Sequence, residues 1–194
     1  MRQMLGRVLV AGLSLSALIA LTVPAFASAV SVTRSASEFR YREAPVVPVV
    51  VPTRDEQAVI DLVNDQRAKA GLHALTLNTT LTSSARGHSK EMASKKYFSH
   101  YSYNGERYDN RIVRYGYTRK GYSSWAADEN IYWGCNLFST PVAVVQAWMG
   151  SPTHRAVILD PKVTEIGVGA TFTSSFKGQQ NVTIYTLDAG SRTQ

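Results

Sequence analysis

Apolar residues recur at helical spacing in three parts of the chain that have clear start and stop signals. These predicted helices cover residues 53–71, 78–96 and 140–150. Thr53 and Glu56 form a capping box at the first start, and Asn78 is the expected cap of the second. Thr140 followed by Pro141 marks the third, since a hydroxyl cap and a proline at the first helical position favour helix entry. Two shorter helical pieces are expected at residues 108–115 and 155–159.

In the C-terminal part of the chain, apolar and polar residues alternate instead. Residues 164–174 place Ile166, Val168, Ala170 and Phe172 on one side, which predicts a strand half-buried on one face. Gly167 and Gly169 would let a neighbouring backbone or an aromatic ring approach this strand closely. A turn at residues 177–180 returns the chain into a second alternating strand over residues 181–187, whereas residues 118–128 are expected to be loop. Three or four helices with a closing antiparallel hairpin predict an α+β layered domain.

Residues 1–27 have the features of an export signal. Arg2 and Arg7 precede an apolar run over residues 8–23, and Ala25-Phe26-Ala27 is the small-x-small pattern that signal peptidases recognise. The alternative is a permanent membrane anchor, but the run is short for a bilayer span and the cleavage pattern follows it directly. We therefore expect a signal peptide that is removed, and a secreted, extracellular protein.

The next segment, residues 28–53, places Pro45, Pro48 and Pro52 among valines. This density of proline blocks helix and central strand, so an extended tether is expected before a single folded domain over residues 54–190. Removing the leader takes away two arginines and no acids, so the formal charge falls from +7 to +5. A cluster of cations at residues 95–120 favours weak electrostatic contact with an anionic envelope or lipid surface. Nucleic acid is excluded as a partner by the lack of a recognition motif.

Three other residues have mainly structural interpretations. His88 lies on the apolar face of the second helix and is expected to be a core histidine with a buried partner, and His73 is expected at the surface. Cys135 is the only cysteine, so no internal disulfide can form. It is expected to be a small buried side chain, with a reactive thiol as the alternative.

Candidate chemistry lies in His100, Glu129 and His154. Each histidine follows a predicted helix end, and Glu129 is expected in a third loop, next to Asn130. Two neutral imidazoles can hold a divalent metal ion, with the carboxylate as a ligand or as the group that orients one of them. The alternative is ordinary loop capping by the same residues.

Four blocks in register resemble a known family: YFSH, ENIYWG, AVVQAWMGSPTHRAVILDP and TEIGVG. In this order they are similar to a bacterial member of the CAP superfamily, the domain of cysteine-rich secretory proteins, antigen 5 and plant pathogenesis-related class 1 proteins. The resemblance covers residues 55–188. It implies an α-β-α sandwich of three or more helices around a small antiparallel sheet. It also implies a cleft with two histidines and two acids, which binds zinc or another divalent cation in some members.

Matched by position, His100 and His154 correspond to the family's histidines and Glu129 to one acid. Ser151 stands where many members have the second acid, three residues after the helix tryptophan. Serine cannot supply a carboxylate. Glu165 is near in sequence and is a candidate substitute, although a residue on a strand need not point into the cleft. The resemblance therefore implies a ligand cleft formed by His100, Glu129, Asn130, Ser151 and His154, with His100 and His154 as the metal ligands.

Three functions are compatible with these residues. The favoured one is a non-catalytic secreted module that binds an apolar, lipid or envelope-derived ligand in the cleft or in a neighbouring groove, a role that the resemblance implies. The alternative is a metal-dependent, protease-like hydrolase, in which Glu129 would act as the base. No nucleophile motif supports that alternative, so no catalytic residue is assigned. In the third, the polar cluster only stabilises loops and the basic face binds envelope polymers.

Overall fold

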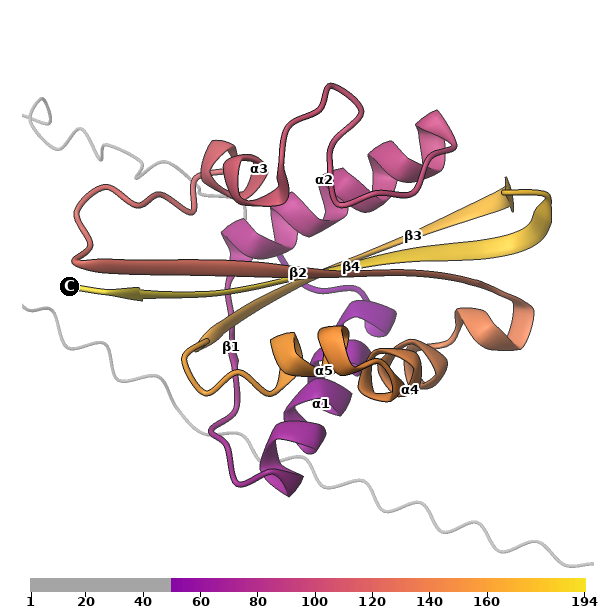
Figure 1. The fold of residues 1–194 in the computed structure, drawn as a ribbon. Helices are drawn as coiled ribbons and strands as arrows, with labels where there is room; N and C mark the ends of the chain where they lie inside the picture. Colours follow the sequence, from indigo (N-terminus) through magenta and orange to yellow (C-terminus); the bar gives the residue numbers. More distant parts are fainter. Residues whose placement is uncertain (1–49) are drawn as a thin grey trace, which may run out of the picture. The chain divides into compact units, whose positions relative to one another are not determined.

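The computed structural model describes residues 50–194, which form five α-helices, a short 3₁₀ turn and a four-stranded sheet (Figure 1). In chain order the elements are α1 (Arg54–Lys69), β1 (Thr76–Leu77), α2 (Thr79–Lys95), α3 (Tyr108–Arg114), β2 (Ser124–Cys135), η1 (Asn136–Ser139), α4 (Pro141–Gly150), α5 (Pro152–Ile158), β3 (Glu165–Phe176) and β4 (Gln179–Thr193). The predicted signal peptide and most of the predicted tether lie outside the described residues.

The sheet is the middle layer of three. Its strand order is β1-β3-β4-β2, so β2 lies at one edge. α2 and α3 cover one face, and α1, α4 and α5 cover the other (Figure 1). The α+β fold class and the α-β-α sandwich are thereby confirmed. The sheet is mixed rather than purely antiparallel, because the two-residue β1 pairs in parallel with β3.

The predicted helix starts are confirmed by their caps. Thr53 Oγ1 accepts from the Glu56 amide at 3.3 Å, and Glu56 Oε2 accepts from the Thr53 amide at 2.7 Å. The Asn78 side chain accepts from the amides at the start of α2, and Thr140 Oγ1 accepts from Ala143 N at 3.3 Å. These signals involve neighbours in sequence, which is why they could be interpreted before the fold was known.

The loop prediction is wrong for residues 124–128, which belong to β2. The segment Ser124–Asp128 has one aromatic and no β-branched residue, so its own strand propensity is low. Pairing with β4 makes it a strand, with Ser124 opposite Thr193 and Glu129 opposite Asp188. β4 therefore continues past the predicted end at Leu187, and Glu129 lies on a strand rather than in a loop.

The strand predicted to be half-buried is covered on both sides where it passes α2. Ile166 and Val168 pack into the core under α1, α4 and α5. On the opposite face, a Cβ on Gly167 would lie 2.1 Å from Thr82 N, and one on Gly169 would lie 2.2 Å from Arg86 N. The backbone of α2 therefore rests directly on the two glycines, as the sequence predicted for their role.

Candidate functional site

Glu129 is at the centre of the polar cluster. Its side chain is fully buried, on the face of β2 that α2 and α3 cover. His100 Nδ1 donates to Glu129 Oε1 at 2.8 Å, and Arg111 Nη2 donates to Glu129 Oε2. Both carboxylate oxygens are thus occupied, one by a buried guanidinium and one by an imidazole whose side chain is 43% exposed.

Arg111 is one of the cations counted in the predicted basic surface, and that interpretation is wrong. It lies on α3 with 1% of its surface exposed, because the short helix turns it toward the sheet. Its Nη1 donates to Ser102 Oγ at 3.0 Å and its Nη2 to Glu129. A buried carboxylate requires a partner of this kind, since an unpaired charge in the interior is strongly unfavourable.

Asp188 is a second buried carboxyl group, and no sequence pattern singles it out. It stands opposite Glu129 on β4, with its side chain on the same face, and is fully buried. Neither of its oxygens has a hydrogen-bond partner within residues 50–194, and the same is true of Ser84 Oγ and Arg111 Nε. Burial, and then the neighbouring charge of Glu129, raise the pKa of Asp188 well above its usual range, while Arg111 partly opposes the shift.

His154 reaches the same edge of the sheet from the other layer. It lies within α5, not in a loop after a helix as expected, because Pro152 restarts the chain as a helix immediately after α4. Asn130 Nδ2 donates to the His154 carbonyl at 2.9 Å and so fixes α5 to β2. Burial and then the nearby His100 lower the pKa of His154. The two histidines are thus attached to neighbouring residues of the edge strand β2, His100 through Glu129 and His154 through Asn130.

Tyr108 and Asp128 complete the border of this cluster. The Tyr108 hydroxyl donates to Asp128 Oδ1 at 3.4 Å, and its ring meets the His100 ring edge-on, with 6.4 Å between the centroids. Burial and then the charge of Asp160 raise the pKa of Asp128. Neither residue was predicted as part of the site, although Asp128 directly precedes Glu129.

The two positions considered for a second acid have partners of their own. Ser151 joins α4 to α5, and its hydroxyl lies 3.1 Å from Thr153 Oγ1. Glu165 is bound by Asn78 Nδ2 at 2.7 Å, by the Tyr117 hydroxyl and by Arg192. Glu165 is thus part of a separate network at the start of β3, and the suggestion that it substitutes for the missing acid is wrong.

The structural interpretations of His88 and His73 are confirmed, and that of Cys135 holds in part. His88 is fully buried with Nε2 2.8 Å from the Ser99 carbonyl, and His73 is exposed. Cys135 is half-buried, with its sulfur 3.9 Å from the Gln179 side-chain oxygen. Within residues 50–194, no group of three or more His, Cys, Asp or Glu residues is arranged to hold a metal ion.

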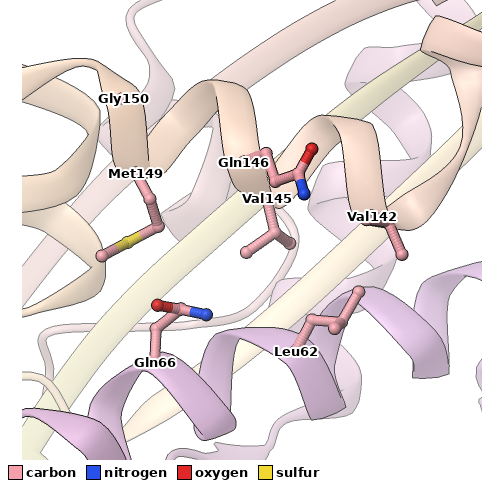
Figure 2. Close-up of a pocket in the computed structure, with 7 residues that line it drawn as sticks. All are labelled: Leu62, Gln66, Val142, Val145, Gln146, Met149 and Gly150. Carbon is pink, nitrogen blue, oxygen red and sulfur yellow. The ribbon is translucent and has the colours of Figure 1, made fainter.

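A cavity of about 370 Å³ lies between α1 and α4, apart from the histidines (Figure 2). Its lining residues are Leu62, Gln66, Val142, Val145, Gln146, Met149 and Gly150. None of them is charged, and Figure 2 shows Leu62 and Gln66 on α1 facing the α4 side chains. A groove beside the cleft is one of the expected ligand sites, but its place could not be predicted, because its walls come from helices about 80 residues apart.

The fold and the position-matched residues define a class of protein. The sequence model of the cysteine-rich secretory protein (CAP) family matches residues 60–187, two thirds of the chain, and the chain belongs to this family. It is 40% identical over 126 residues to the uncharacterized protein YkwD of Bacillus subtilis, and 32% identical over 120 residues to the uncharacterized membrane protein YlbC of the same organism. These matches cover 64% and 61% of this chain but only 46% and 32% of those proteins.

Solved structures agree with the assignment. An extracellular protein of Bacillus anthracis with an SCP domain matches with a TM-score of 0.55 and 30% identity, over 70% of this chain and 39% of that one. An outer surface protein of Borrelia burgdorferi matches with a TM-score of 0.58 and 20% identity, over 74% of this chain and 96% of that one, which shows the shared fold. No helix within residues 50–194 is both long enough and apolar enough to span a bilayer.

The buried Asp188 should make stability depend on pH. A carboxyl group whose pKa is raised in the fold stabilises the protein at low pH, and this contribution is lost as the pH rises from about 3.8 through the folded-state pKa. Asp188→Asn keeps the shape of the side chain but cannot ionise. The free energy of unfolding of this variant should therefore rise relative to that of the wild type as the pH increases. Urea unfolding of both proteins between pH 4 and pH 9 measures this difference.

Asp109→Asn is the matched control of opposite sign. The hydrogen bonds from Arg107 lower the pKa of Asp109 to about 2, so its stabilisation is present above pH 3.8 and is lost as the pH falls toward 2. This variant should therefore be less stable than the wild type at neutral pH. A difference between Asp188→Asn and the wild type that does not change with pH would show that Asp188 titrates normally.

Proposed function

We propose that this protein is an exported binding module that holds the acyl chain of an envelope lipid between α1 and α4. The observation that carries the proposal is the groove of Figure 2, where Leu62, Val142, Val145 and Met149 form an uncharged lining. Its volume of about 370 Å³ falls in the usual range for ligand sites, about 300–1,000 Å³. Gln66 and Gln146 supply the only side-chain amides of the lining, which suit an ester or amide linkage.

Export is the second part of the proposal. It is supported by the leader pattern of residues 1–27 and by the extracellular description of the similar Bacillus anthracis protein. Binding is favoured over the hydrolase alternative because Glu129, the only base considered, is buried and bonded on both oxygens. A general base must reach the proton that it removes.

Binding can be tested with monooleoylglycerol as the probe, by native mass spectrometry and by displacement of a fluorescent acyl chain. Met149→Glu places a charge against the lipid chain and is expected to weaken binding at least about tenfold, since an unpaired carboxylate is costly in an apolar site. Met149→Leu keeps the lining apolar and should bind about as well as the wild type. Wild-type protein that takes up no probe, or equal binding by Met149→Glu, would contradict the proposal.

A divalent cation at His100 and His154 is a second candidate. The observation that favours it is the bond from His100 Nδ1 to Glu129, because metal-binding histidines are commonly oriented by a carboxylate on the other ring nitrogen. Two imidazoles are fewer than the three or four protein ligands of tight zinc sites. The residues therefore fit an exchangeable ion completed by water, with Glu129 orienting His100 and Arg111 holding Glu129.

Zinc titration by calorimetry tests this second candidate. Wild-type protein is expected to bind one zinc ion weakly, and both His100→Ala and His154→Ala should abolish the heat of binding. His73→Ala, which changes an exposed histidine outside the cluster, is the control and should leave the titration unchanged. Unchanged zinc binding in both cluster variants would exclude this site, whatever the result for the lipid groove.

A further inference from the structure

The 3₁₀ turn η1 presents the most exposed large apolar side chain of the described residues. Leu137 is 84% exposed and its neighbour Phe138 is 68% exposed, and we call this pair the η1 tip. The tip lies between β2 and α4, at the end of the sheet where β3 and β4 join (Figure 1). A single exposed apolar residue is common on soluble proteins, but adjacent ones that protrude from a turn call for a partner.

The tip is held in place by its backbone. The hydroxyl of Tyr132 donates to the Phe138 carbonyl at 3.0 Å, and the hydroxyl of Tyr185 donates to the Ser139 carbonyl at 2.8 Å. Gly134 lets the turn lie against β2, since a Cβ there would be 2.1 Å from the Phe138 carbonyl oxygen. These contacts fasten the carbonyls to the sheet, while the side chains of the η1 tip remain in solvent. The exposure is thus a property of an ordered turn.

Phe172 extends the apolar surface across the sheet. Gly134, the β2 residue under the turn, and Phe172 are both opposite Thr183. The backbones of Gly134 and Phe172 are therefore two strand spacings apart, about 10 Å. Phe172 points to the same face of the sheet as the tip and is 65% exposed. Val142, at the start of α4, is 51% exposed and also lines the α1–α4 groove. Val142 therefore belongs both to this set of exposed apolar residues and to the groove lining.

The segments that carry this surface contain few charged residues. No Asp, Glu, Lys or Arg occurs between Asn130 and Thr153, and Lys177 is the only one between Ile166 and Leu187. Lys177 is exposed in the β3–β4 turn, and Lys96 reaches the same end of the sheet from the end of α2, with Nζ 2.6 Å from the Ser175 carbonyl. One acid lies on the α1 side, since burial and then the charge of Asp55 raise the pKa of Tyr185. Apolar side chains flanked by lysines match the interface of a bilayer with anionic head groups, where the lysines meet lipid phosphates.

We propose that the η1 tip inserts into the interfacial region of an anionic lipid bilayer, with Phe172 and Lys177 as flanking contacts. Leu137 and Phe138 would be buried among the acyl chains near the head groups, and Val142 would face the membrane surface. This orientation places one end of the α1–α4 groove next to the lipid. The insertion depends only on the exposed side chains, so it holds whether or not the groove takes an acyl chain.

The apolar N-terminal segment of the full chain could bind vesicles by itself. The test therefore reads the surroundings of a single labelled cysteine instead of total vesicle binding. In Cys135→Ser/Leu137→Cys, an environment-sensitive NBD label reports from the tip. In Cys135→Ser/Lys162→Cys, it reports from the exposed connection between α5 and β3. With vesicles of phosphatidylglycerol and phosphatidylcholine, the tip label should shift to the blue and the Lys162 label should not. Equal shifts at both positions, or none at the tip, would overturn the proposal.

Two further variants separate the parts of the inference. Phe138→Ser/Phe172→Ser in the tip-labelled chain should weaken vesicle binding at the tip by at least about tenfold, since each residue loses its apolar burial. Tyr101→Ser removes an exposed aromatic residue elsewhere and should have no effect. Met149→Glu should leave the tip shift intact, so failure of acyl-chain binding is distinguishable from failure of insertion. A shift of equal size on pure phosphatidylcholine would overturn the requirement for anionic lipid. A shift that appears only when another protein is added, and not with vesicles, would show that the partner of the tip is a protein and would overturn insertion into a membrane.

Discussion

Arg111→Met is expected to lower the free energy of unfolding by about 3–5 kcal/mol, the usual cost of removing one partner of a buried ion pair. The change leaves Glu129 buried without a cation and next to the second buried carboxyl group, Asp188. It also removes the bond from Arg111 Nη1 to Ser102 Oγ. His100 can compensate little, because it is on the solvent side of the cluster and bonds only Oε1 of Glu129.

Urea unfolding at neutral pH measures the effect, and two variants make it specific. Arg114→Met removes an exposed partner of Glu106 and should cost at most about 1 kcal/mol. The double variant Arg111→Met/Glu129→Gln removes the stranded charge and should recover part of the loss, because an uncharged pair of similar size is tolerated. A loss below about 1 kcal/mol in Arg111→Met would mean that the buried pair contributes no more than a surface one.

The same cluster shows how far the sequence could predict the site. His100, Glu129 and His154 are candidates from the sequence alone, because polar residues near predicted element ends often converge and because these three match a family pattern. Arg111 and Asp188 carried no local signal: one resembled a surface cation and the other followed a predicted strand end. Their roles depend on pairing between β2 and β4 and on how α3 packs on the sheet, which are contacts between residues far apart in sequence.

The fold shows the same division. Helix starts at Thr53, Asn78 and Thr140 were predicted correctly because capping involves residues two or three positions apart. The start of β2 was missed because Ser124–Asp128 becomes a strand only through its partner. The positions of the α1–α4 groove and of the η1 tip could not be predicted for a related reason. The residue type alone does not show whether an apolar side chain is buried or exposed in the fold.

Gly169→Ala is expected to cost about 3 kcal/mol or more, the upper end of the range for overpacking. A Cβ at this position would lie 2.2 Å from Arg86 N and 2.3 Å from the Ala85 carbonyl carbon. Both contacts are backbone atoms of α2, so no side-chain rotation can relieve them, and the helix must move away from the sheet. That movement would pull Ser89 Oγ from its bonds to the Gly169 carbonyl at 3.0 Å and to Thr186 Oγ1 at 2.9 Å.

Gly150→Ala is the matched control, since the same methyl group has open space at the end of α4 and no atom within 4 Å. It should be neutral or stabilising by about 0.5–1 kcal/mol, because alanine loses less backbone freedom on folding. Thermal and urea unfolding of the two variants give the comparison, and near-UV circular dichroism reports whether Gly169→Ala still packs its aromatic core. Equal stability of the two variants would show that α2 can shift freely on β3. The position of α2 over Gly169 also sets the place of Ser84 beside Asp188. Equal stability would therefore mean that the strand glycines do not fix this side of the buried cluster.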